Sequence, residues 1–122
     1  MSDGFIVFIR HEDKLLLLKR GEEVTDFANC WDGVYGVGDH NDLDHVFKRI
    51  EDSTGIQSSS LTFVRMGDAR GIEFGNRLNE VTPILFVSDT SEIEPRTLYD
   101  EAMWVDPGYL NVLSPELFVQ VV

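Results

Sequence analysis

The stretch VGDHNDLDHVFKRIEDSTGI, residues 37–56, decides how the rest of this chain is arranged. It predicts a glycine-marked loop, an amphipathic helix over about residues 42–54, and a stop at Gly55, where glycine readily takes the left-handed conformation that ends a helix. Asn41 or Asp42 can cap the helix, because both side chains accept hydrogen bonds from its first N–H groups. Apolar side chains recur at the spacing i, i+3, i+4, i+7, which predicts one stripe facing a core. The members of this stripe are Leu43, Val46, Phe47 and Ile50.

Two runs before the helix have the pattern of a β-hairpin. Residues 5–10, FIVFIR, are rich in branched and aromatic side chains, and residues 14–20, KLLLLKR, form a second apolar run after a short polar turn. A polar loop is expected over residues 21–29. The segment at 31–38, WDGVYGVG, alternates glycine with larger residues, so its backbone is expected to need unusual dihedral angles or a close approach to a neighbour.

Further strands and two short helices are predicted after the helix. The expected strands span residues 61–65, 78–88 and 102–105. Residues 67–76 are expected to form a glycine-punctuated connection, and Pro83 is expected at a sheet edge or a bulge because proline has no N–H to donate. Residues 107–113 and 115–121 predict short C-terminal helices. The order of elements predicts an α/β (α+β) fold, a mixed β-sheet sandwiched between helices, in one domain over residues 1–122.

The chain is strongly acidic and contains one cysteine. Twenty-two Asp and Glu residues against ten Lys and Arg give a formal charge of −12. This balance argues against general nucleic-acid binding, because Lys and Arg neutralise phosphates there. A solvated acidic surface explains it, and a source with high internal salt would suit it. The single Cys30 allows no internal disulfide and favours a cytoplasmic location. We expect neither a signal peptide nor a membrane-spanning segment.

Residues 34–56 resemble the signature box of the Nudix hydrolase family. The box runs Gly, five residues, Glu, seven residues, and then Arg-Glu-apolar-any-Glu-Glu-any-Gly-apolar. Anchored on Gly55, this pattern places Lys48 at the arginine of the box. The expected hairpin, the aromatic-glycine segment and a late Glu-x-x-Trp element at 101–104 extend the resemblance over about residues 5–113. The resemblance implies a Nudix-like sheet and helix arrangement.

The acidic positions of the box carry other residues here. Arg49 stands at the glutamate after the arginine, Asp52 and Ser53 at the paired glutamates, and His40 at the isolated one. The resemblance implies hydrolysis of a nucleoside diphosphate linked to another moiety, with Mg²⁺ or Mn²⁺ held by box glutamates. A guanidinium about 5 Å from a divalent ion repels it by roughly 6–7 kcal/mol at an effective dielectric of about 20. We therefore expect Arg49 to pair with Asp52 on the helix surface, and divalent metal at this position is disfavoured.

The resemblance and the residue types nominate a small set of candidate site residues. The candidate catalytic carboxylates are Asp52 and Glu101, the candidate metal ligands are Asp52, Asp39 and Glu80, and the candidate substrate contacts are Arg20, Arg49 and Trp31. Each has a structural alternative. The acidic residues near the helix entrance can cap the helix and complement its dipole, and the tryptophan can pack in the core.

Three functions are open on these observations, so whether the chain is an enzyme is open too. The first is a Nudix-fold protein that binds a nucleotide or another pyrophosphate compound, with metal-dependent hydrolysis lost or weakened. The second is an active Mg²⁺- or Mn²⁺-dependent hydrolase with substitute carboxylate ligands. The third is a structural or interaction domain without a ligand, and Pro83 in an edge strand is compatible with a homodimer. The expected cofactor is accordingly Mg²⁺ or Mn²⁺, or none.

Overall fold

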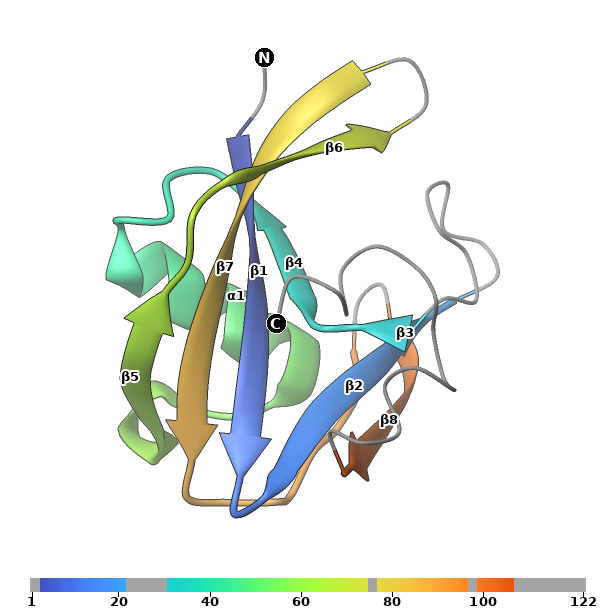
Figure 1. The fold of residues 1–122 in the computed structure, drawn as a ribbon. Helices are drawn as coiled ribbons and strands as arrows, with labels where there is room; N and C mark the ends of the chain where they lie inside the picture. The colour runs from blue at the N-terminus through green and yellow to red at the C-terminus, as the bar shows by residue number, and fades with distance from the viewer. Residues whose placement is uncertain (1–2, 22–30, 75–76, 97–98, 107–122) are drawn as a thin grey trace.

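A mixed β-sheet with one α-helix packed on it forms the centre of the molecule (Figure 1). The computed structural model describes residues 3–21, 31–74, 77–96 and 99–106. The strands are β1 (Asp3–His11), β2 (Lys14–Arg20), β3 (Trp31–Asp32), β4 (Val34–Val37), β5 (Leu61–Met66), β6 (Arg70–Phe74), β7 (Arg77–Ser88) and β8 (Tyr99–Val105). The helices are α1 (Leu43–Thr54) and a short 3₁₀ turn, η1 (Ser58–Ser60). The helices expected at 107–113 and 115–121, and the loop at 22–29, lie outside the described residues.

On one side of β1 the sheet divides into two branches, β4 and the pair of β2 and β3. We call the place where these branches separate the fork. The main strand order of the sheet is β3-β2-β1-β7-β5, with β4 paired to β1, β6 to β7 and β8 to β2. β1 runs parallel to β7 and antiparallel to both β2 and β4. On the side away from β7, the first half of β1 pairs with β4 and its last two residues pair with β2. The expected hairpin of β1 and β2 is confirmed, and Gly33 lies in the fork between β3 and β4.

The sheet buries side chains on both faces, which explains why its central strands read as continuous apolar runs. In β1, Phe5 packs in the cluster that contains helix α1, and the adjacent Ile6 packs in the cluster on the opposite face. The helix contributes Val46 and Ile50, both fully buried. The predicted helical stripe is therefore confirmed at these two positions. It is wrong at Leu43, which is 44% exposed because the helix buries mainly its middle and its C-terminal end.

The ends of α1 agree with the sequence. The Asp42 side chain caps the helix by accepting a hydrogen bond from the N–H of His45 at 3.3 Å. Gly55 follows the last turn with a φ of 81°, a left-handed conformation in which glycine has no side chain to strain. Among the described residues, no helix is long and apolar enough to span a membrane.

The segment before β8 is fastened to the C-terminal end of α1. The N–H of Glu94 donates to the carbonyl of Thr54, and the N–H of Arg96 donates to the carbonyl of Ser53, both at 2.9 Å. Terminal helix carbonyls have no partner within the helix, so these bonds satisfy two of them. As a result Ser53 and Thr54 are fully buried, although both stand at the end of a surface helix.

Three strand predictions need correction. The expected connection at 67–76 contains strand β6, and β8 begins at Tyr99 rather than at residue 102. Pro83 is not at a sheet edge, because β7 pairs with β1 on one side and with β5 and β6 on the other. Proline is tolerated there because β7 changes partner at this point. The carbonyl of Pro83 accepts from Gly67 N at 2.8 Å, so the missing N–H faces the gap between β6 and β5.

Candidate functional site

The polar residues before α1 organise the start of the helix. An Asp39 carboxylate oxygen accepts a hydrogen bond from the N–H of Asn41 at 2.8 Å, and Asp42 caps the first turn. His45 turns back, and its Nε2 lies 2.8 Å from the carbonyl oxygen of Val37. These bonds close the loop between β4 and α1. They place the candidate ligand Asp39 in an exposed turn.

Asp52, the acidic residue retained at a box position, pairs with a different cation from the one expected. Its carboxylate lies 3.6 Å from the ammonium of Lys48, one helical turn away. The expected pair between Arg49 and Asp52 is wrong. The physical reason is that Lys48 reaches along the outer surface of α1, whereas the Arg49 guanidinium turns inward toward β4.

A second cation, Arg96, is near enough to Asp52 to be affected by its charge. Arg96 is hydrogen-bonded to Glu94 at 2.8 Å. That hydrogen bond, the charge of Glu94 and the charges of Glu51 and Asp52 raise the pKa of Arg96. The neighbouring box position, Ser53, is fully buried, and its hydroxyl has no hydrogen-bond partner among the described residues. At the paired-glutamate positions the helix therefore presents one carboxylate, Asp52, which is paired with Lys48, and one buried hydroxyl.

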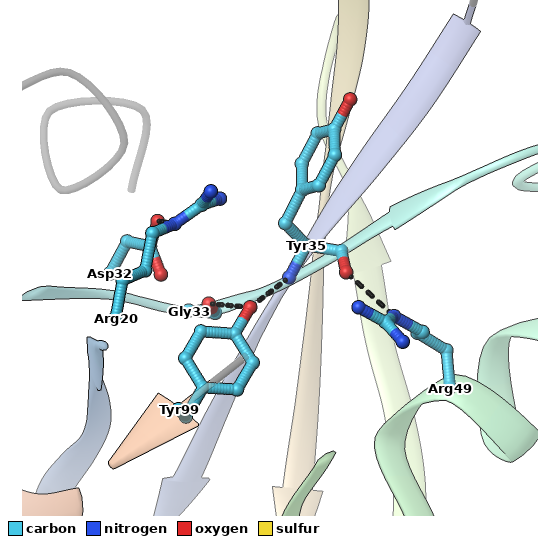
Figure 2. A network of polar contacts seen from close by, with 6 residues as sticks. All are labelled: Arg20, Asp32, Gly33, Tyr35, Arg49 and Tyr99. Carbon is cyan, nitrogen blue, oxygen red and sulfur yellow. Dashed lines mark hydrogen bonds and ion pairs between the residues drawn. The ribbon is translucent and has the colours of Figure 1, made fainter. Parts of the chain in front are cut away.

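Arg49 is the box residue with the most specific contact. Its Nε donates a hydrogen bond to the backbone carbonyl of Tyr35 at 2.9 Å (Figure 2). The side chain is half-buried between α1 and β4. Among the described residues no carboxylate forms an ion pair with Arg49, and its two Nη nitrogens make no hydrogen bond. A fixed guanidinium with two uncommitted donor groups is suited to bind an anion.

A buried ion pair lies on the other side of Tyr35. Arg20 Nε is 3.0 Å from an Asp32 carboxylate oxygen, and the two side chains are 4% and 2% exposed. The Arg20 guanidinium also lies over the Tyr35 ring, 5.5 Å from its centroid. Burial raises the pKa of Asp32 to about 7, while the charge and the hydrogen bond of Arg20 act in the opposite direction. Arg20, a candidate substrate contact, is thus held inside the fork.

Tyr99 connects the two branches at the fork, because it lies on β8, which pairs with β2, and binds the backbone of Gly33 and Tyr35. Its hydroxyl accepts a hydrogen bond from the N–H of Tyr35 at 2.9 Å and donates one to the carbonyl of Gly33 at 3.3 Å (Figure 2). Burial, and to a smaller extent the charge of Asp32, raises the pKa of Tyr99. The phenol is therefore protonated at neutral pH and able to act as donor and acceptor at once.

The remaining candidates lie on separate elements. Glu101 is exposed on β8 and pairs with Lys19 at 3.2 Å, and Glu80 is exposed on β7 opposite Gly71. Trp31 is half-buried and packs against the cluster on the face opposite α1. Asp39, Asp52, Glu80 and Glu101 are not brought together, and in the described part of the chain no three His, Cys, Asp or Glu side chains form a group that could hold a metal ion. The donor set does not fit a divalent ion at the box helix.

Sequence reasoning did not find Asp32, Tyr35 or Tyr99. An acidic residue between Trp31 and Gly33, within an apolar and glycine-rich segment, was the available signal for a buried carboxylate. No comparable signal marked Tyr99, because it stands in an acidic stretch before the strand expected at 102–105.

Several solved structures share the fold of this chain, although their sequences differ widely from it. No family model matches this chain, and no curated protein matches it in sequence. A Caenorhabditis elegans Ap4A hydrolase binary complex superposes with a TM-score of 0.77 at 11% identity, covering 93% of this chain and 85% of that one. The Escherichia coli dihydroneopterin triphosphate pyrophosphohydrolase superposes with a TM-score of 0.72 at 16% identity, covering 97% of this chain and 90% of that one. The NUDIX domain of Shewanella oneidensis NrtR, complexed with ADP ribose, superposes with a TM-score of 0.72 at 11% identity. The match covers 98% of this chain and 80% of that one.

Proposed function

We propose, from the premise that this chain has the Nudix fold, that it binds a nucleotide or another pyrophosphate compound and that metal-dependent hydrolysis is lost or weakened. The observation that carries the proposal is the position of Arg49. A guanidinium, fixed by the Tyr35 carbonyl at 2.9 Å, occupies the box position where the family pattern has a glutamate. The proposal includes the cytoplasmic location suggested by the single cysteine.

The loss of metal-dependent hydrolysis is supported by the charges along α1. Mg²⁺ requires hard oxygen ligands in near-octahedral geometry, usually carboxylates together with phosphates and water. Here Asp52 is paired with Lys48, Ser53 is buried, and Arg49 is a cation. Each of these three positions carries a glutamate in the family pattern. Bound Mg²⁺ or Mn²⁺ would supply phosphate-charge neutralisation, and this chain offers a guanidinium for part of that task.

The class of ligand is supported by the donors of Arg49 and by the solved structures. A guanidinium binds phosphate oxygens through parallel N–H groups, and such charge-assisted bonds are roughly twice as strong as neutral ones. The similar structures include an Ap4A hydrolase, a triphosphate pyrophosphohydrolase and a domain complexed with ADP ribose. Each of these three proteins acts on or holds a phosphate compound. In a chain with a net charge of −12, an arginine without a carboxylate partner in the described residues is a favourable place for such an anion.

Calorimetric titration with ADP ribose tests the binding proposal. The wild-type protein should bind equally well in Mg²⁺ and in EDTA, and Arg49→Gln should weaken binding at least tenfold, since a hydrogen bond to a charged group contributes about 1.5–3 kcal/mol. Lys48→Gln is the matched control, because Lys48 is a neighbouring cation on the same helix whose side chain points outward. Equal losses in both variants would mean that only general charge is sensed. No binding of ADP ribose or of other nucleotides would favour an interaction domain.

Turnover measurements test the loss of hydrolysis. Phosphate release from a panel of nucleotides with Mg²⁺ or Mn²⁺ should stay at background. Clear turnover that is abolished by Asp52→Asn would overturn the proposal in favour of an active hydrolase with substitute ligands.

A further inference from the structure

We infer that Tyr99 is a positioning residue for Arg49 and acts through the backbone of Tyr35. The inference rests on the proposed function, because it assigns the group that holds the anion-binding guanidinium in place. The hydrogen bonds from which it is argued are present without a ligand. Tyr99 and Arg49 bind the two backbone polar groups of a single residue, Tyr35, on β4.

The edge of β4 explains why two side chains meet at this residue. β4 pairs antiparallel with β1, with Tyr35 opposite Ile6. In a strand, the N–H and C=O of one residue point to the same side, and at Tyr35 both are bound by side chains rather than by β1. The N–H donates to the Tyr99 hydroxyl at 2.9 Å, and the carbonyl accepts from Arg49 Nε at 2.9 Å. The two side chains thus take the place of a neighbouring strand.

The Tyr99 hydroxyl also makes a second hydrogen bond along the same edge of the backbone. It donates to the carbonyl of Gly33, two residues before Tyr35, at 3.3 Å. Gly33 is pressed against β1, and a side-chain carbon added there would lie 2.3 Å from the carbonyl oxygen of Val7. The backbone from Gly33 to Tyr35 is therefore held between β1 and one phenol. This arrangement sets the direction in which the Tyr35 carbonyl points.

The direction of that carbonyl determines how Arg49 can meet an anion. Because Nε is committed to Tyr35, the two Nη groups, which bond to no described residue, are the donors left for an anion. If the Tyr99 hydroxyl is removed, the Tyr35 N–H loses its partner and the strand edge loosens. Arg49 then gains rotamer freedom that it must give up when it binds an anion.

Tyr99→Phe tests this inference, with Trp104→Phe as the matched control. Trp104 lies on the same strand and donates one side-chain hydrogen bond, to Ser91 O at 2.9 Å, and this bond does not involve β4. Two readouts are needed, the Nε–H resonance of Arg49 by NMR without ligand and the affinity for inorganic pyrophosphate in EDTA by calorimetry. Tyr99→Phe should move the resonance and weaken pyrophosphate binding by a few-fold to about tenfold, the cost of ordering one long side chain on binding. Trp104→Phe should change neither.

The outcomes separate the two proposals. An unchanged Arg49 resonance and unchanged affinity in Tyr99→Phe would overturn the positioning role while leaving the proposed function intact. If the wild-type protein binds neither pyrophosphate nor ADP ribose, the proposed function fails, and the ligand-free resonance still decides the role of Tyr99.

A measurement on the wild-type protein covers the case in which Tyr99→Phe does not fold. One opening of the β4 edge should release both groups of Tyr35. The Tyr35 amide and the Arg49 Nε–H should therefore show similar protection against hydrogen exchange. Strong protection of the amide with none at Nε would contradict the inference.

Discussion

Two polar regions of this molecule each contain a pair of oppositely charged side chains, but the pairs differ in their exposure to water. One region is the outer surface of α1, and the other is the fork between β2 and β4. On α1, Lys48 and Asp52 form a pair whose side chains are 75% and 45% exposed. In the fork, Arg20 and Asp32 form a pair whose side chains are 4% and 2% exposed. Water competes for the first pair and is excluded from the second. Charge on the helix can therefore change at little cost, whereas charge in the fork is tied to the fold.

This difference explains how the family box can lose its acidic residues while the fold persists. The apolar face of the helix and its caps hold the structure, and its outer row contributes little to folding. The polar groups in the fork are enclosed by the sheet, so each needs a partner. The following predictions test this contrast, from the largest expected effect to the smallest.

Removing one member of the buried pair should have the largest effect on stability. Arg20→Met at pH 8 leaves Asp32 buried without its cation, so the carboxyl must either stay ionised or take up a proton, and breaking a buried pair costs about 3–5 kcal/mol. The free energy of unfolding from urea denaturation measures this loss. The double variant Arg20→Met with Asp32→Leu should recover most of it, because no isolated charge remains. A loss below about 1 kcal/mol in the single variant would show that water reaches the fork.

The buried carboxyl should also give the fold a pH dependence with a defined sign. The pKa of Asp32 rises from 3.8 to about 7 on folding, so the folded protein holds this proton more tightly than the unfolded chain. Its contribution to the free energy of unfolding is then greatest below about pH 4 and declines as the pH rises to about 7. Asp32→Asn should remove this component.

Urea denaturation at constant ionic strength between pH 4 and pH 7 measures the component. Stability should decline less steeply in Asp32→Asn than in the wild-type protein. Asp68→Asn, at an exposed position, serves as the control. Parallel curves for the wild type and Asp32→Asn would mean that Arg20 keeps Asp32 ionised throughout the range.

An intermediate effect is expected at the start of α1. Asp42→Ala removes the side chain that accepts from His45 N, and the loss of such a cap costs about 1 kcal/mol. Thermal denaturation of this variant should be compared with that of Asp44→Ala, a neighbouring acidic residue in the first turn that is not the cap. Similar losses in both variants would mean that general charge near the helix dipole, rather than the cap, provides the stability.

The smallest effect is expected at the exposed pair on α1. Lys48→Met should change the free energy of unfolding by less than about 0.5 kcal/mol, because an exposed i,i+4 pair contributes about 0.3–0.5 kcal/mol and is screened by salt. Urea denaturation at low and high salt measures the change. A loss comparable to that of Arg20→Met would erase the contrast between the two regions.

The sequence predicted the features that depend on local pattern. Apolar periodicity and capping residues gave α1 and its ends, and β-rich runs gave the hairpin of β1 and β2. It could not predict partners that are far apart in the chain. Tyr99 and Tyr35 are 64 residues apart, and their contact arises because β8 pairs with β2 beside the fork.

The errors have the same origin. Pro83 lies inside the sheet because β5 and β6 share one side of β7, an arrangement that no local pattern encodes. Similarly, Arg49 was expected to pair with Asp52 on the same helix, but the Tyr35 carbonyl of β4 is closer to its guanidinium. The candidate site was therefore predictable in its position on α1 and not in its contacts.

Calorimetric titration of Mg²⁺ into the protein tests the central claim most directly, with Arg49→Glu measured alongside. The account predicts no specific Mg²⁺ binding by the wild-type protein, because Arg49 stands in place of an acidic ligand and Asp52 is paired with Lys48. It predicts detectable binding by Arg49→Glu, which replaces the repelling cation with a second carboxylate beside Asp52. Tight Mg²⁺ binding by the wild-type protein would contradict the account.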